Sequence, residues 1–155
     1  MTSPDSLLSR SERAFLADAR RAVLATITAD GVARLVPICH ILDPEDPVLY
    51  TPLDDKPKEV ADPYVLARVR DILREPGVSV LVEHWDEDWE RLAWLRCHGR
   101  ASLLDPHGDT ADEHRTAVAS LRAKYPQYAT HRLESRPVIR IDIERATSWG
   151  SLDPA

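Results

Sequence analysis

The chain has 155 residues, of which 43% are hydrophobic and 30% are charged, and its formal net charge is −6. This length and composition are those of one globular domain and exclude a disordered tail protein. The acidity argues against nucleic-acid binding, because phosphate backbones are bound by cationic surfaces.

The sequence lacks the features of a membrane, secreted or disulfide-stabilised protein, and these three absences predict its cellular location. No apolar run is long enough to cross a membrane as a helix, and residues 1–11 lack the basic and apolar stretches of a secretory signal. The two cysteines, Cys39 and Cys97, are too few for a disulfide framework. We therefore expect a reduced, cytoplasmic protein.

The N-terminal third predicts a helix followed by strands. Ser9 and Glu12 have the spacing of a capping box that opens a helix over 9–22. Asp30-Gly31 is a hairpin signal between two apolar, β-branched runs. Pro37 cannot donate to a ladder, so its strand should be edge-like or bulged. The strands of this third are expected over 23–28, 32–39 and 48–51.

The remaining two thirds alternate between helices and strands. Helices are expected over 62–74 and 109–125, and strands over 78–82, 93–101 and 138–144, with an acidic loop over 83–90. About six strands, mostly joined without crossover helices, predict a mainly β fold. The expectation is an antiparallel β-barrel with flanking helices, as one domain over 1–155 with its core in 9–149.

One candidate site follows the third strand. Lys56 and Lys58 are two of only three lysines in a chain with 17 arginines, and Tyr50-Thr51 ends the preceding strand. A strand end followed by such a loop can present ammonium groups and backbone N–H groups to an anion. The pattern also suits a solvated loop in which two aspartates balance the lysines.

A second candidate is one face of the strand over 93–101. Trp94, Arg96, His98 and Arg100 alternate with small apolar residues. Such a face is not a core face; it meets solvent, an anionic aromatic ligand or another subunit. Trp85 and Trp89 lie close by in sequence, and a tryptophan cluster favours an interface.

Other chemistry is disfavoured by spacing. Each cysteine has a histidine as its neighbour, and neighbouring residues in a strand point to opposite faces, so a thiolate pair is not expected. The six histidines show no metal-site pattern, and no metal is predicted. Five glycines contain no phosphate-binding motif of the Gly-rich kind.

Several short motifs follow one another in a distinctive order. They are Ala25-Thr26, Asp30-Gly31, Arg34-Leu35-Val36-Pro37, Leu49-Tyr50-Thr51, the segment 75–82 and Gly99-Arg100-Ala101. This order resembles the split-barrel flavin-binding family related to pyridoxamine 5′-phosphate oxidase, over residues 9–149. The segments 50–58, 88–89 and 124–128 are similar to an actinobacterial branch that depends on the deazaflavin coenzyme F-420.

The resemblance implies a homodimer with two cofactor sites at the subunit interface. It implies an oxidoreductase that transfers hydride from a reduced deazaflavin to an unsaturated small-molecule acceptor. The implied cofactor-binding residues are Arg34, Val36, Pro37, Ile38, Tyr50, Thr51, Lys56, Lys58 and Arg68, with Trp94 contributed by the second subunit. No side-chain acid stands out; Tyr50 or a water would supply the proton.

Two departures from the oxidase pattern matter. The oxidases have Arg-Lys where this chain has Lys56-Pro57, and their arginine-containing C-terminal tail is absent, so vitamin oxidase activity is not expected. FMN remains the alternative cofactor. Two further alternatives are a protein that binds or stores a cofactor without turnover and a haem-binding split barrel; binding without reductase activity would distinguish the storage protein.

Overall fold

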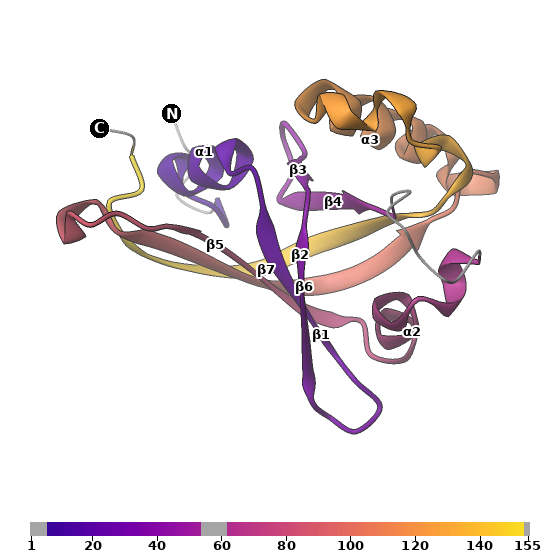
Figure 1. Ribbon diagram of the computed structural model, residues 1–155, viewed down its shortest axis with the longest axis horizontal. Helices are drawn as coiled ribbons and strands as arrows, with labels where there is room; N and C mark the ends of the chain where they lie inside the picture. The colour runs from indigo at the N-terminus through magenta and orange to yellow at the C-terminus, as the bar shows by residue number, and fades with distance from the viewer. Residues whose placement is uncertain (1–5, 54–61, 154–155) are drawn as a thin grey trace.

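A single curled antiparallel sheet forms the centre of the computed structural model, which describes residues 6–53 and 62–153 (Figure 1). The strands lie in the order β2-β1-β5-β6-β7-β4-β3. Their bounds are β1 Ala22–Ile27, β2 Ala33–Ile38, β3 Ile41–Leu42, β4 Val48–Pro52, β5 Gly77–His84, β6 Ala93–Leu104 and β7 Val138–Gly150. The edge strands β2 and β3 are joined by only two residues, so the sheet curls into a half-barrel.

Three α-helices flank the sheet (Figure 1). They are α1 Arg10–Asp18, α2 Ala67–Arg74 and α3 Ala111–Lys124. Short 3-10 turns cover Pro63–Val65, Trp89–Arg91, Gly108–Thr110, Pro126–Thr130 and Leu133–Ser135. Within the described residues, none of the helices has the length and apolar character needed to span a membrane.

The expected fold class is confirmed in outline and corrected in detail. The described residues form seven strands rather than about six, because Ile41–Leu42 pairs with β4 as a strand too short to show periodicity. The first helix ends at Asp18 instead of residue 22, since Ala22 already pairs in β1. Its capping box is present: the Glu12 amide donates to Ser9 Oγ at 3.0 Å. Pro37 does lie on an edge strand.

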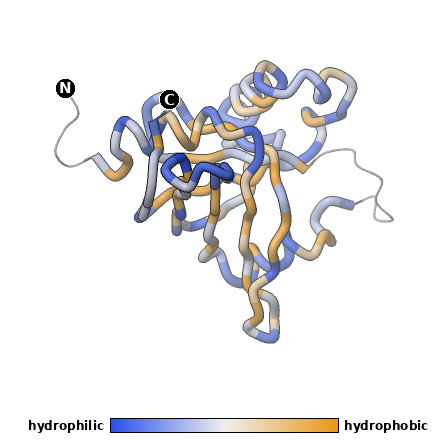
Figure 2. Tube along the Cα trace, turned by 60° about the vertical axis from the view of Figure 1, so that its left-hand side comes forward, coloured by the Kyte–Doolittle hydropathy of each residue, from blue (hydrophilic) through white to orange (hydrophobic). Residues whose placement is uncertain are grey.

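Two hydrophobic clusters divide the core between the two faces of the sheet. Inward-facing residues such as Leu24, Val80 and Leu95 form the larger cluster, which includes residues of α1 and α2. The second cluster, which includes Leu121 and Val138, lies between the sheet and α3. Figure 2 shows the hydrophobic residues concentrated along the strands. The predicted alternation of β6 is confirmed, because every second residue from 93 to 101 is buried.

Helix α3 leaves much of the outer surface of the sheet uncovered. Leu35 is 67% exposed and Trp149 is 54% exposed on this surface. We call it the open face; by strand register it includes Leu35, Pro37, Val23, Ala25, Ser79, Leu81, Glu83, Trp94, Arg96, His98, Arg100, Arg145, Thr147 and Trp149. A sheet face that exposes large hydrophobic side chains such as Leu35, Leu81 and Trp149 is typical of a surface that meets another molecule.

Lys124 joins the end of α3 to the end of α1 and to the two-residue link between β2 and β3. Its Nζ donates to the carbonyl oxygens of Ala17 at 2.9 Å, Ala19 at 2.7 Å and His40 at 2.9 Å. The neighbouring Tyr125 hydroxyl accepts a hydrogen bond from the His40 amide at 3.0 Å. Lys124 and Tyr125, which are part of the family resemblance, therefore have a structural role: they hold the end of α3 against residues 17–19 and His40.

His40 is fully buried at this contact and makes the fold sensitive to acid. Its Nε2 lies 2.8 Å from the Leu16 carbonyl oxygen, to which it donates. Burial, with a smaller effect from Lys124, lowers the pKa of His40 to about 4. The unfolded chain therefore binds this proton more readily, and stability should be lost as the pH falls from 6.5 towards 4.

We expect the His40 contribution to amount to about 3 kcal/mol of unfolding free energy between pH 7 and pH 4. Urea unfolding of the wild type and of His40→Gln at both pH values measures it, because the shared carboxylate titrations cancel in the difference. His107→Asn, at an exposed histidine, is the control. Equal pH dependence in wild type and His40→Gln would contradict the assignment.

Candidate cofactor and substrate site

The end of β4 leads into the predicted basic loop. Thr51 is 2% exposed, and its neighbour Pro52 pairs with Val138 of β7. Lys56 and Lys58 lie outside the described residues. The structure therefore positions the strand end from which this loop departs.

Tyr50 is buried beneath α3, where its side chain belongs to the second hydrophobic cluster. Its hydroxyl donates to Glu113 Oε2 at 2.6 Å, and Arg140 forms an ion pair with the same carboxylate. Burial and the bond to Glu113 raise the pKa of Tyr50 well above its ordinary value. Of the two proton sources expected from the sequence, Tyr50 or a water, the Tyr50 hydroxyl is therefore a weakened acid that is bonded to a side chain of α3.

Tyr50→Phe tests the position of this hydroxyl. We expect a loss of about 1 kcal/mol in unfolding free energy, since Glu113 keeps Arg140 as a partner, and no change in cofactor affinity. Chemical denaturation and a cofactor titration of the same variant measure both. A tenfold weaker cofactor with unchanged stability would show that the hydroxyl contacts the cofactor.

The predicted site residues of β2 do not form one group, because successive side chains of a strand point to opposite faces of the sheet. Val36 and Ile38 face inward with Leu24 and Ala22, whereas Pro37 lies on the open face. Arg34 Nε donates to Asp71 of α2 at 2.7 Å, and its side chain remains 42% exposed. Arg68, also on α2, is half-buried.

Asp71 gathers three donors from three elements. Besides Arg34, it accepts from Thr26 of β1 at 2.7 Å and from Arg74 at 3.2 Å. Burial alone would raise the pKa of Asp71, but the bonds from Arg34, Thr26 and Arg74 outweigh it and hold that pKa below its ordinary value. The carboxylate thus fixes α2 against the β1–β2 hairpin and orients Arg34.

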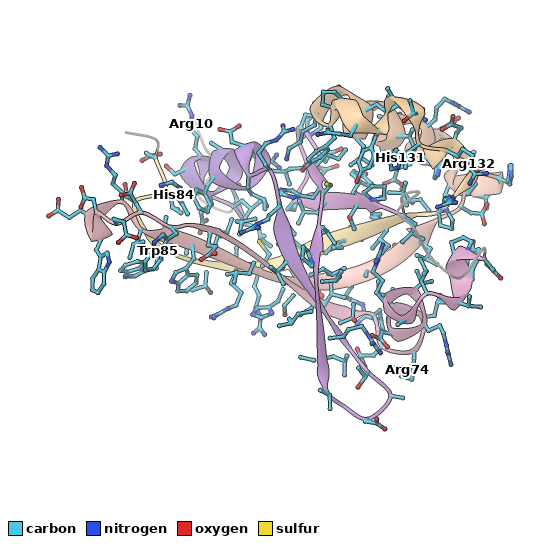
Figure 3. All side chains as sticks on the ribbon, viewed as in Figure 1. Arg10, Arg74, His84, Trp85, His131 and Arg132 are labelled. Atoms are coloured by element: carbon cyan, nitrogen blue, oxygen red, sulfur yellow. The ribbon has the colours of Figure 1, made fainter. Side chains whose placement is uncertain are left out.

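Trp94 lies on the open face, as the alternation of its strand predicts. It pairs with Glu83 of β5 and with Trp149 of β7, and the guanidinium of Arg96 lies 5.3 Å from the centre of its ring. Trp85 is at the free end of the same β5–β6 hairpin (Figure 3) and is 61% exposed. A flat ring system could stack here against aromatic surface.

A cavity of about 930 Å³ opens beside this face. It lies between the end of α1, the start of β1, the end of β5 and the C-terminal segment 151–153. Its apolar lining includes Phe15, Val23, Pro37 and Leu81, and its charged lining includes Arg21 and Glu83. This volume is at the upper end of the range for small-molecule sites. The cavity and Trp94 are close, because Glu83 lines the one and pairs with the other.

The structure thus brings some of the predicted residues together and separates others. Pro37 lines the cavity and Trp94 lies beside it, whereas Tyr50 and Arg34 are engaged with α3 and α2. Sequence reasoning missed the cavity, because its walls come from five separate stretches of the chain. It also missed Ser79, although Ser79 alternates with buried valines of β5 in the way that revealed the β6 face.

The chain matches a known family over most of its length. The family model described as pyridoxamine 5′-phosphate oxidase matches residues 8–150. No curated protein matches the sequence.

Solved structures share the fold at low identity. The conserved hypothetical protein Rv2991 from Mycobacterium tuberculosis is 21% identical with a TM-score of 0.71, covering 97% of this chain and 89% of that one. The haem storage protein HutZ from Vibrio cholerae is 12% identical with a TM-score of 0.64, covering 94% and 95%. An F420 reductase is 19% identical with a TM-score of 0.61, covering 87% and 94%. These likenesses concern the fold.

Proposed function

The chain belongs to the pyridoxamine 5′-phosphate oxidase family, and from this premise we propose that it is an oxidoreductase whose cofactor is the deazaflavin coenzyme F-420, with FMN as the alternative. The observation that carries the proposal is the cavity of about 930 Å³ beside the open face. Its apolar lining and charged rim suit a planar, apolar ring system with polar edges.

We propose that the active form is a homodimer that meets through the open face. Exposed Leu35, Leu81 and Trp149 give this face an apolar character that solvent does not favour. In such a dimer each cofactor site is completed across the interface, with Trp94 of the partner subunit against the ring. Sedimentation velocity should detect a dimer, and Leu35→Glu should dissociate it.

The cofactor residues divide by what each can contribute. Lys56 and Lys58 supply positive charge for a phosphate, and Thr51 fixes the start of their loop. Pro37 and Leu81 offer apolar surface to the ring, while Arg34 keeps an exposed guanidinium near α2. For Val36, Ile38, Tyr50 and Arg68 the proposed role is to shape the site from within the fold, as their burial suggests.

When bound, a reduced deazaflavin supplies a hydride for an unsaturated acceptor. The chain's part is to hold ring and acceptor in contact and to exclude water from the apolar lining of the cavity. Since the Tyr50 hydroxyl is engaged by Glu113, the proton that completes a reduction would come from solvent at the rim.

Parallel titrations of the purified protein with FMN and with coenzyme F-420 test the proposal. We expect tighter binding of the deazaflavin, and about tenfold weaker binding after Lys56→Ala because a phosphate loses a cationic partner. Arg10→Gln, at an exposed position on α1, is the matched control. Binding of neither cofactor would overturn the proposal, and tight FMN binding alone would assign the alternative cofactor.

A cofactor-binding or storage protein is the second candidate function. The observation that favours it is the engagement of Tyr50, which removes the side-chain acid that the sequence offered. A reductase assay over a panel of unsaturated acceptors distinguishes the two. Tight binding without turnover on any acceptor would support storage.

A further inference from the structure

A pair of hydrogen-bonded side chains lies in the middle of the open face, and in the dimer proposed above it therefore lies at the subunit interface. Ser79 Oγ is 2.6 Å from His98 Nδ1, between the paired strands β5 and β6. The bond occupies one ring nitrogen, and Nε2 lies on the opposite side of the imidazole. A partly exposed histidine held in this way can offer Nε2 to a ligand.

Two guanidinium groups flank this histidine. Arg145 of β7 is paired directly with His98 across the sheet, and Arg96 is two residues before it on the same face. Arg100, two residues after His98 on that face, lies opposite Asp142 instead. Burial, together with the charges of Arg145 and Arg96, lowers the pKa of His98. Both arginines are exposed, so the cluster presents like charges side by side.

Some arginines of the fold are balanced by a carboxylate, whereas others, such as Arg10, Arg21 and Arg70, form no ion pair within the described part of the chain. Arg34, Arg74, Arg91, Arg115, Arg122 and Arg140 each form an ion pair with a carboxylate. For Arg96 and Arg145 no such pair forms among residues 6–53 and 62–153, although the chain carries a net charge of −6. By strand register Glu83 lies opposite Trp94 and Asp142 lies opposite Arg100, and Glu144 is next to Arg145 in sequence.

Positive charges on neighbouring side chains repel one another, and an anion bound between them removes that repulsion. We propose that His98, held by Ser79, forms with Arg96 and Arg145 a binding site for the phosphate or carboxylate group of a small molecule. Guanidinium groups suit both anions, because their planar N–H donors match two oxygens. The imidazole adds a third donor from Nε2.

The molecule that carries this anion is the acceptor substrate. This step rests on the proposed function, since Lys56 and Lys58 are there assigned to the phosphate of the cofactor. The substrate class is then an unsaturated compound that bears a phosphate or carboxylate group. The proposal of an anion-binding site does not depend on this step, because it is argued from His98, Arg96 and Arg145 alone.

Inorganic phosphate is the probe for the site, titrated by calorimetry into cofactor-free protein at constant ionic strength. We expect saturable binding to the wild type and at least tenfold weaker binding to the double variant Arg96→Gln/Arg145→Gln. His98→Asn should weaken phosphate less. Arg10→Gln is the control for lost positive charge elsewhere. Absence of saturable binding, or equal binding by wild type and double variant, would overturn the site.

Thermal unfolding gives an independent measurement. Phosphate should raise the melting temperature of the wild type but not of the double variant, which without phosphate should melt at or above the wild-type temperature because a repulsion is removed. An equal rise in both proteins would be a general effect of the salt on the fold and would overturn the site.

Titration with FMN and riboflavin, which differ by one phosphate, identifies the source of the anion. An unchanged FMN affinity in the double variant supports the assignment to the acceptor. A loss confined to FMN would overturn that assignment in favour of the cofactor phosphate. Because the phosphate titration needs no cofactor, failure of the proposed function leaves its result intact.

Discussion

Replacement of Lys124 by methionine is expected to lower the free energy of unfolding by about 4 kcal/mol. The carbonyl oxygens of Ala17 and Ala19 would lose this donor, whereas that of His40 keeps the Tyr125 hydroxyl. Each carbonyl left unsatisfied costs about 1–3 kcal/mol. Burial and the charge of Arg20 lower the pKa of Lys124 to about 8. At pH 7 the amine is therefore charged and has one N–H for each carbonyl.

Urea unfolding followed by circular dichroism measures this loss. Arg115→Met is the matched control, because Arg115 also lies on α3 but its side chain is 75% exposed and pairs only with Asp112 there. We expect the control to change stability by less than about 0.5 kcal/mol. Similar losses in the two variants would show that the Lys124 bonds contribute little.

Sequence reasoning placed most elements because their local signals agree with the tertiary structure. The alternation of residues 93–101 predicts both the strand and its buried side, and the capping box marks the start of α1. The Ile41–Leu42 strand has no such signal, since its pairing with β4 comes from the curl of the whole sheet. Local pattern alone therefore predicts the strand number only approximately.

The candidate site was harder to predict, because a lysine or tyrosine that is typical of a cofactor site can instead have a structural role. Lys124 and Tyr125 belong to a motif that suggested a cofactor-dependent family, yet they bond α3 to α1 and to His40, between β2 and β3. Tyr50 carries a phenol at a strand end, yet the phenol faces a helix that sequence could not place. Which face of the sheet each helix covers decides these roles, and that depends on contacts distant in sequence.

Asp71 illustrates the same dependence and leads to the second large effect. No motif marks this aspartate, but its carboxylate is buried between β1, β2 and α2, with Thr26, Arg34 and Arg74 as donors. Asp71→Ala would leave Arg34 and Thr26 without their acceptor and detach α2 from the hairpin. We expect a loss of about 3–5 kcal/mol in unfolding free energy.

Acid should reveal the same carboxylate without a mutation. Because the pKa of Asp71 is lower in the folded protein than in the unfolded chain, its contribution is complete above the unfolded pKa, near 4. It is lost as the pH falls through the lower, folded value. The wild type should therefore lose more stability than Asp71→Asn when the pH falls below 4.

Denaturant unfolding of both proteins between pH 5 and pH 2.5 measures the difference. Asp112→Asn is the control, since the Asp112 side chain is 94% exposed. A steeper loss in the wild type than in Asp71→Asn identifies the buried carboxylate as an acid-sensitive link between α2 and the sheet. Parallel curves would mean that the link is held by the apolar contacts of Val69 and Ile72 instead, and that Arg34 is oriented without it.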